Sequence, residues 1–165
     1  MKVVLLYASK YGATEKAAKL MAEQLKGEVK LINLKEEIPS TIEEFDTVLL
    51  ASSIYAGRMQ GEISKFTTTY KDQIMNKNIG VFVCCKEENP EKITEYLKLN
   101  LPEEMIKKAF IKEYLGHEVK FDKMNFFERF LLKRILKVKE SYSQINLEGI
   151  KRVSNIINEM DVANG

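Results

Sequence analysis

The sequence has no apolar run near the roughly 20 residues that a membrane-spanning helix needs. It also lacks a signal peptide pattern, because an apolar strand begins directly after Lys2. Its only two cysteines, Cys84 and Cys85, are adjacent, and neighbouring strand residues point to opposite faces, which disfavours a bridge between them. We therefore expect free thiols and a cytoplasmic protein.

No repeat, linker or low-complexity segment interrupts the 165 residues, and 45% hydrophobic content suffices for the core of one domain. We therefore expect a single domain over residues 1–165. The net charge is only +2, and its positive excess is local. Residues 121–140 carry three acidic side chains against six basic ones, Lys123, Arg129, Lys133, Arg134, Lys137 and Lys139.

Apolar segments alternate with segments of helical periodicity. Strands are expected at Val3–Ala8, Glu28–Leu34, Thr47–Ser52, Ile79–Cys85 and Ala109–Val119. Helices are expected at Thr14–Lys26, Gln60–Gln73, Pro90–Leu99 and Leu147–Met160, with a single helical turn at Thr41–Phe45. This alternation predicts an α/β fold of three layers, in which a five-stranded parallel sheet of order 2-1-3-4-5 is covered on both faces.

The loop after the first strand has the residues of an anion site. It consists of Ser9, Lys10, Tyr11, Gly12, Ala13 and Thr14, and a helix follows at once. Unpaired backbone N–H groups and the dipole at a helix N-terminus favour a phosphate. The three-glycine dinucleotide fingerprint and the Gly-Lys-Ser/Thr ending of a triphosphate loop are both missing, so we expect a single terminal phosphate. The alternative is an ordinary strand-to-helix turn capped by Ser9 or Thr14.

Two further loops are expected at the same edge of the sheet. The loop after the third strand contains Ser52, Ser53, Ile54, Tyr55, Ala56 and Gly57, in which Tyr55 is placed to stack on a flat ring. The loop after the fourth strand begins at Cys85 and Lys86. Taken singly, a surface tyrosine and a solvated turn are the simpler interpretations. Together with the phosphate loop, they predict a ligand with a phosphate at one end and a planar ring at the other.

With these loops the chain resembles the flavodoxin family over nearly its whole length. The resemblance implies flavin mononucleotide (FMN) as the cofactor, with the 14 residues named in the three loops as its contacts. The family's phosphate loop usually reads Thr-x-Thr-Gly-x-Thr, whereas here Tyr11 replaces the middle hydroxyl residue. Ordinary flavodoxins are also acidic and carry a tryptophan near the ring, and this chain has none.

A basic, aromatic insert separates the fifth strand from the last helix. As a helix over Met124–Val138 it carries one apolar stripe, but Phe126 and Phe130 fall outside that stripe, among basic residues. Such a basic amphipathic helix is typical of a contact with an anionic membrane surface, here through residues 121–138, or with a partner protein. The alternative is a helix packed in a groove of its own domain.

The insert and the segment Ala51–Gly57 resemble the quinone-linked protoporphyrinogen dehydrogenases, a flavodoxin-like branch. That resemblance implies an FMN-dependent enzyme of heme biosynthesis, which passes electrons from protoporphyrinogen IX to menaquinone at the inner face of the membrane. His117, Arg58 or Arg129 would then meet propionates or move protons. The alternatives are a flavodoxin-type carrier between redox partner proteins and a scaffold without flavin. No nucleic acid partner is expected.

Overall fold

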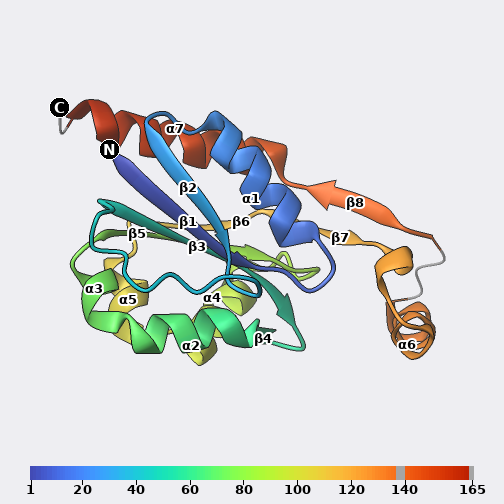
Figure 1. Ribbon diagram of the computed structural model, residues 1–165. Coiled ribbons are helices and arrows are strands. Elements are labelled where there is room, and N and C mark those ends of the chain that lie inside the picture. Colours follow the sequence, from blue (N-terminus) through green and yellow to red (C-terminus); the bar gives the residue numbers. More distant parts are fainter. Residues whose placement is uncertain (137–139, 164–165) are drawn as a thin grey trace.

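The chain is described from a computed structural model, which covers residues 1–136 and 140–163. Its central sheet has the order β2-β1-β3-β5-β6, formed by Glu28–Asn33, Lys2–Ala8, Thr47–Tyr55, Asn78–Cys84 and Ile111–Tyr114. All four neighbouring pairs are parallel (Figure 1). The predicted order 2-1-3-4-5 is confirmed. A short strand, β4 (Arg58–Met59), folds back on β3 as an antiparallel hairpin.

Helices cover both faces of this sheet, as predicted. One face carries α1 (Ala13–Gln24) and α7 (Leu147–Ala163) (Figure 1). The other carries α2 (Gly61–Thr69), α3 (Lys71–Met75), α4 (Pro90–Asn100) and α5 (Glu103–Lys108). The short helix α5 was not predicted.

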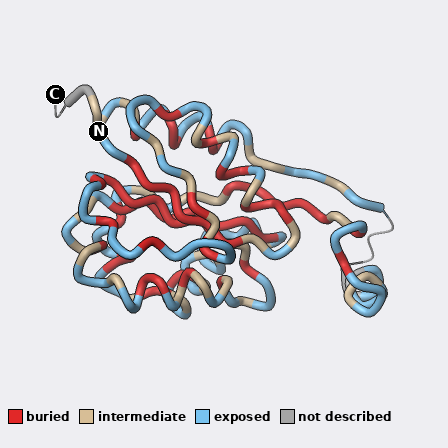
Figure 2. The backbone as a smooth tube through the Cα atoms, in the orientation of Figure 1, coloured by how far each residue is buried: buried red, intermediate tan, exposed pale blue. Residues whose placement is uncertain are grey.

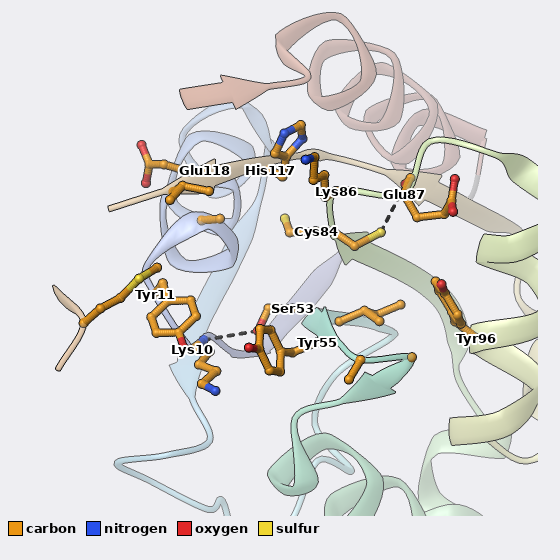
Figure 3. Close-up of a pocket in the computed structure, with 17 residues that line it drawn as sticks. Lys10, Tyr11, Ser53, Tyr55, Cys84, Lys86, Glu87, Tyr96, His117 and Glu118 are labelled. Atoms are coloured by element: carbon orange, nitrogen blue, oxygen red, sulfur yellow. Dashed lines mark hydrogen bonds between the residues drawn. The ribbon is translucent and has the colours of Figure 1, made fainter. Parts of the chain in front are cut away.

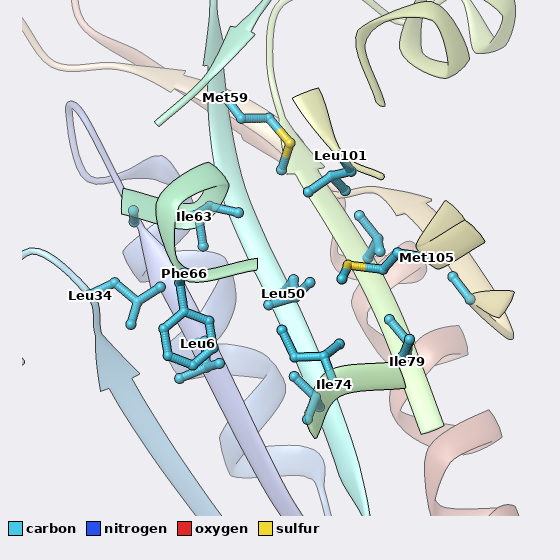
Figure 4. Close-up of a cluster of buried hydrophobic side chains, with 14 of the residues drawn as sticks. Leu6, Leu34, Leu50, Met59, Ile63, Phe66, Ile74, Ile79, Leu101 and Met105 are labelled. Carbon is cyan, nitrogen blue, oxygen red and sulfur yellow. The ribbon is translucent and has the colours of Figure 1, made fainter. Parts of the chain in front are cut away.

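The three central strands, β1, β3 and β5, are buried on both sides because their apolar residues run without interruption. Successive side chains alternate between two cores: Leu6 and Leu50 face α2 and α3, and Leu5 and Leu49 face α1 and α7. Figure 2 shows the buried residues following the strands, and Figure 4 shows the first core around Leu50. The two cores hold the strand ends, and therefore the loops that follow them, in fixed positions.

The prediction of one strand over Ala109–Val119 was wrong. The chain bends at Gly116, whose φ of 88° only glycine adopts readily, and divides into β6 and β7 (Gly116–Val119). Strand β7 leaves the central sheet and pairs antiparallel with β8 (Tyr142–Ile145), which was not predicted. This β7–β8 ribbon extends from the body of the molecule beside α1 (Figure 1).

Two predicted helices also differ. The helix over Gln60–Gln73 breaks at Tyr70, which separates α2 from α3. The segment Thr41–Phe45 forms one turn, in which Phe45 N donates to Ile42 O at 3.2 Å, and does not continue as a helix. Glu43 N donates to Thr41 Oγ1 at 3.1 Å, and Ile42 N donates to Gln73 Oε1 at 3.0 Å.

The insert forms a 3-10 turn, η1 (Phe121–Lys123), and a helix, α6 (Phe126–Leu136). The helix begins two residues later than predicted, after a reciprocal cap in which Glu128 N donates to Asn125 Oδ1 at 2.8 Å. Val138, the predicted end, lies outside the described residues. In the part of the chain that the structure describes, no helix is long and apolar enough to cross a bilayer.

Candidate functional site

The three predicted loops meet around one cavity at the carboxyl end of the sheet. The register places Ala8 opposite Ser52, and Ser53 opposite Cys84, so the loops that follow β1, β3 and β5 are neighbours. The cavity has a volume of about 370 Å³ (Figure 3). Ten of the predicted site residues line it: Lys10, Tyr11, Ala13, Ser53, Ile54, Tyr55, Ala56, Gly57, Cys85 and Lys86.

The loop after β1, which was predicted to be an anion cradle, is held by hydrogen bonds within itself and to the next loop. Gly12 precedes α1 with a φ of 101°, and its N–H donates to Ser9 Oγ at 3.0 Å. Lys10 N donates to Ser53 Oγ at 3.1 Å, which ties this loop to the loop after β3 (Figure 3). Ser9, Gly12 and Thr14 are not among the residues that line the cavity. Their contact with an anion stays a prediction.

Thr14 is fully buried in the first turn of α1. Its Oγ1 has no hydrogen-bond partner of good geometry among the described residues, and the polar group beside it is the thiol of Cys84, a weak donor and acceptor. Buried hydroxyl groups normally have a partner. A phosphate at the N-terminus of α1 would supply a strong acceptor, so the residues present fit an anionic group.

The loop after β3 presents an aromatic ring beside the cradle. Ala56 and Gly57 both have a positive φ, 50° and 74°, which turns the chain into β4. Tyr55 is 38% exposed, and its ring makes an edge-on contact with Tyr11 at 6.3 Å between centroids. Lys10 Nζ lies 4.0 Å from the Tyr55 ring centroid. One face of the cavity is therefore aromatic and has a cation next to it.

Ser52 does not contribute to the cavity. It is buried, and its Oγ accepts from Gln60 N at 3.0 Å and donates to Ser53 O at 3.1 Å. Both capacities of the hydroxyl serve the loop itself. Ser52 is not among the residues that line the cavity and shapes the turn that carries Ser53 and Tyr55; its contact with a cofactor stays a prediction.

Seven cavity residues were missed as cofactor contacts: Cys84, Glu87, Tyr96, His117, Glu118, Val119 and Met124. Three of them belong to β7, which the sequence pattern placed in the central sheet, and Met124 belongs to the insert. The available signal was Gly116, since a glycine inside a strand pattern often marks a bend.

Burial keeps both cysteines unreactive. It raises the pKa of the Cys84 thiol to about 12 and that of Cys85 to about 11. Cys85 Sγ donates to Glu87 O at 3.3 Å. Thiols with such pKa values stay protonated at neutral pH, so neither is a nucleophile.

His117 lies between two tyrosines. Its Nδ1 is 3.1 Å from Tyr114 Oη, and its Nε2 is 3.1 Å from Tyr142 Oη. Burial lowers the pKa of the imidazole below its ordinary value of 6.5, so the ring is neutral at pH 7. The histidine links β6, β7 and β8 and thereby holds the ribbon against the cavity.

A family model described as "Flavodoxin domain" matches residues 4–146 of the chain. No curated protein matches the chain. Among solved structures, flavodoxin 1 of Bacillus cereus is 16% identical, with a TM-score of 0.58, and the match covers 96% of this chain and 98% of that one. A flavodoxin of Fusobacterium nucleatum, solved as a mutant bound to flavin mononucleotide, is 17% identical with a TM-score of 0.50, and 68% of each chain is covered.

Rubredoxin oxygen:oxidoreductase of Desulfovibrio gigas is 20% identical, with a TM-score of 0.55 over 94% of this chain. The chain spans only 36% of the length of that protein. These structures share the fold, and the family model covers most of the sequence. The chain belongs to the flavodoxin family.

Proposed function

We propose that the chain binds FMN, the expected cofactor, in the cavity between its three loops and works as a redox flavoprotein. The observation that carries this proposal is the buried hydroxyl of Thr14, which lacks a good partner at the N-terminus of α1. A phosphate there satisfies the hydroxyl and the N–H groups of the first turn. The Fusobacterium nucleatum flavodoxin, solved as a mutant bound to flavin mononucleotide, supports the choice of ligand.

The two ends of the cavity suit the two ends of FMN. The phosphate would be held by the loop Ser9–Thr14, through backbone N–H groups and the Thr14 hydroxyl. The ring would lie against Tyr55, with Gly57 and the segment Cys85–Lys86 along its edge. FMN supplies the electron-accepting chemistry, and the protein holds, orients and shields it.

The more specific candidate function is that of a menaquinone-linked protoporphyrinogen IX dehydrogenase. The exposed surface of α6 favours it. Phe126 is 87% exposed, Phe127 71% and Phe130 55%, and the same helix carries the exposed basic side chains Lys133 and Arg134. An apolar surface with interspersed cations fits an anionic membrane surface, where apolar substrates and quinones are found. In this proposal, α6 brings the flavin site to the bilayer.

The second candidate is a flavodoxin-type electron carrier. The match with the Bacillus cereus flavodoxin favours this candidate, because it extends over nearly the full length of both chains. That flavodoxin therefore has no additional catalytic domain. In this case α6 would dock a redox partner protein instead of lipid.

One experiment tests cofactor binding and then separates the candidates. The apoprotein is titrated with FMN while flavin fluorescence is followed; quenching that saturates at one FMN per chain supports the proposal, and unaltered fluorescence refutes it. The loaded protein is then mixed with excess protoporphyrinogen IX and menaquinone under nitrogen. Repeated turnover identifies the dehydrogenase, whereas oxidation of one equivalent without turnover identifies the carrier.

A further inference from the structure

Lys123 of the insert lies next to the glycine of the phosphate loop. Its Nζ is 3.1 Å from the position that a Cβ on Gly12 would occupy. Gly12 directly precedes α1, so the ammonium group stands at the N-terminal end of that helix. Residues more than 100 positions apart in the sequence thus meet where the anion cradle opens.

This position is unfavourable for a cation unless an anion lies nearby. The N-terminus of a helix carries partial positive charge and repels an ammonium group. Within the described residues, no carboxylate lies within 4.0 Å of Lys123 Nζ, whereas Lys10 of the same loop pairs with Glu128 at 3.6 Å. Glu15, in the first turn of α1, pairs with Lys19 at 2.7 Å and interacts with Lys123 only over a longer distance. The charge of Lys123 is therefore available to an anion in the cradle.

The structure holds Lys123 in place on both sides. Phe121 and Met124 are buried in a small cluster with Val119, against which Tyr11 of the phosphate loop packs. Arg129 Nε donates to Phe121 O at 3.1 Å, and Phe121 N donates to Ser141 Oγ at 3.1 Å. The turn that carries Lys123 is thus anchored to the loop and to α6, while the side chains of Asp122 and Lys123 are exposed.

We propose that Lys123 binds the phosphate of FMN, so that the insert completes the cofactor site as well as presenting α6. This inference rests on the proposed function. An ammonium–phosphate contact is a charge-assisted interaction, which is stronger than a neutral hydrogen bond. It adds to the site a second cation beside Lys10, the lysine of the loop Ser9–Thr14, which is itself paired with Glu128.

The test compares two ligands that differ only in the phosphate. Wild-type apoprotein and the variants K123Q, K123R and K65Q are titrated with FMN and with riboflavin by fluorescence. We expect K123Q to raise the Kd for FMN about tenfold and to leave the Kd for riboflavin within about twofold. K123R retains the charge and should bind FMN nearly as the wild type does. K65Q removes an exposed lysine from α2 and should change neither Kd.

The outcomes separate this inference from the proposed function. If wild type binds FMN and K123Q binds it equally well, the role of Lys123 is refuted and the proposed function stands. Equal weakening of FMN and riboflavin also refutes it, because the lysine would then support the fold or the ring site. If wild type binds neither flavin, the proposed function itself fails, and the inference fails with it.

Discussion

At the scale of single residues, the cofactor end of this molecule contains polar groups that lack a strong hydrogen-bond or ion-pair partner within the chain. Thr14 is buried without a good partner. Lys123 stands at the same helix end without an ion-pair partner within 4.0 Å among the described residues. By contrast, Ser52 and His117 each make two side-chain hydrogen bonds within the fold. Thr14 and Lys123 can therefore bind a ligand, whereas Ser52 and His117 stabilise the structure around it.

Replacement of Thr14 by valine tests this distinction. The variant keeps the shape of the side chain and removes the hydroxyl, so FMN binding should weaken by roughly 1–3 kcal/mol. The apoprotein should lose no stability, because in it the hydroxyl makes no good hydrogen bond. Fluorescence titration and urea unfolding of the apoprotein measure the two effects. Thr14→Ser, which keeps the hydroxyl, is the control; unchanged FMN affinity in Thr14→Val would remove Thr14 from the site.

At the scale of elements, the β7–β8 ribbon decides which side chains reach the cavity. The chain leaves β6 at Leu115, whose N–H still donates to Val83 O at 2.9 Å, and then turns at Gly116. Gly116 O accepts from Cys85 N at 3.2 Å, so the turn is tied to the end of β5. This turn directs His117 and Glu118 to the cavity. Glu118 pairs with Lys16 at 3.2 Å and Lys120 at 3.0 Å, which joins the ribbon to α1.

Replacement of Gly116 by alanine should therefore loosen the ribbon. A Cβ there would lie 2.1 Å from Gln144 O, and the φ of 88° adds backbone strain. We expect the free energy of unfolding to fall by roughly 2–4 kcal/mol. Gly61→Ala is the matched control, since a Cβ at the start of α2 meets nothing within 4 Å. Urea unfolding of both variants measures the difference, and equal stability would show that the turn tolerates a side chain.

At the scale of the whole molecule, α6 stands apart from the sheet and its covering helices, beyond the β7–β8 ribbon (Figure 1). Its exposed phenylalanines contribute little to the two cores. The insert nevertheless contacts the loop Ser9–Thr14. Tyr11 packs against its buried cluster, and Glu128 pairs with Lys10. The exposed surface of α6 is therefore linked to the cavity through a few direct contacts.

The triple variant Phe126→Ser, Phe127→Ser, Phe130→Ser tests the proposed membrane contact. Wild type should sediment with vesicles rich in phosphatidylglycerol, less so at high salt, because both apolar burial and cationic charge contribute. The triple variant should remain in the supernatant and unfold at nearly the same temperature as wild type, since these side chains are exposed. Leu99→Ser, at an exposed apolar residue on α4, should sediment like wild type. Binding by the triple variant would contradict the membrane contact.

The sequence by itself determined the sheet order, the two covering layers and the three loops, because continuous apolar strands and short loops leave little choice of topology. The local pattern of Ser9–Thr14 also predicted an anion cradle at a helix start. These features depend on interactions between residues close in the chain, or on periodicities that repeat along it.

Only the tertiary structure decided the path of the chain after Leu115 and the residues that it brings to the cavity. Apart from Gly116, the segment Ala109–Val119 is suited to a strand, and the strand that follows the glycine depends on a pairing with Tyr142–Ile145 that no local pattern contains. The same distant pairing places Lys123 beside Gly12 and His117 between two tyrosines. Contacts across such sequence separations follow from packing, which is why the sequence predicted the frame of the site and missed seven of the seventeen residues that line it.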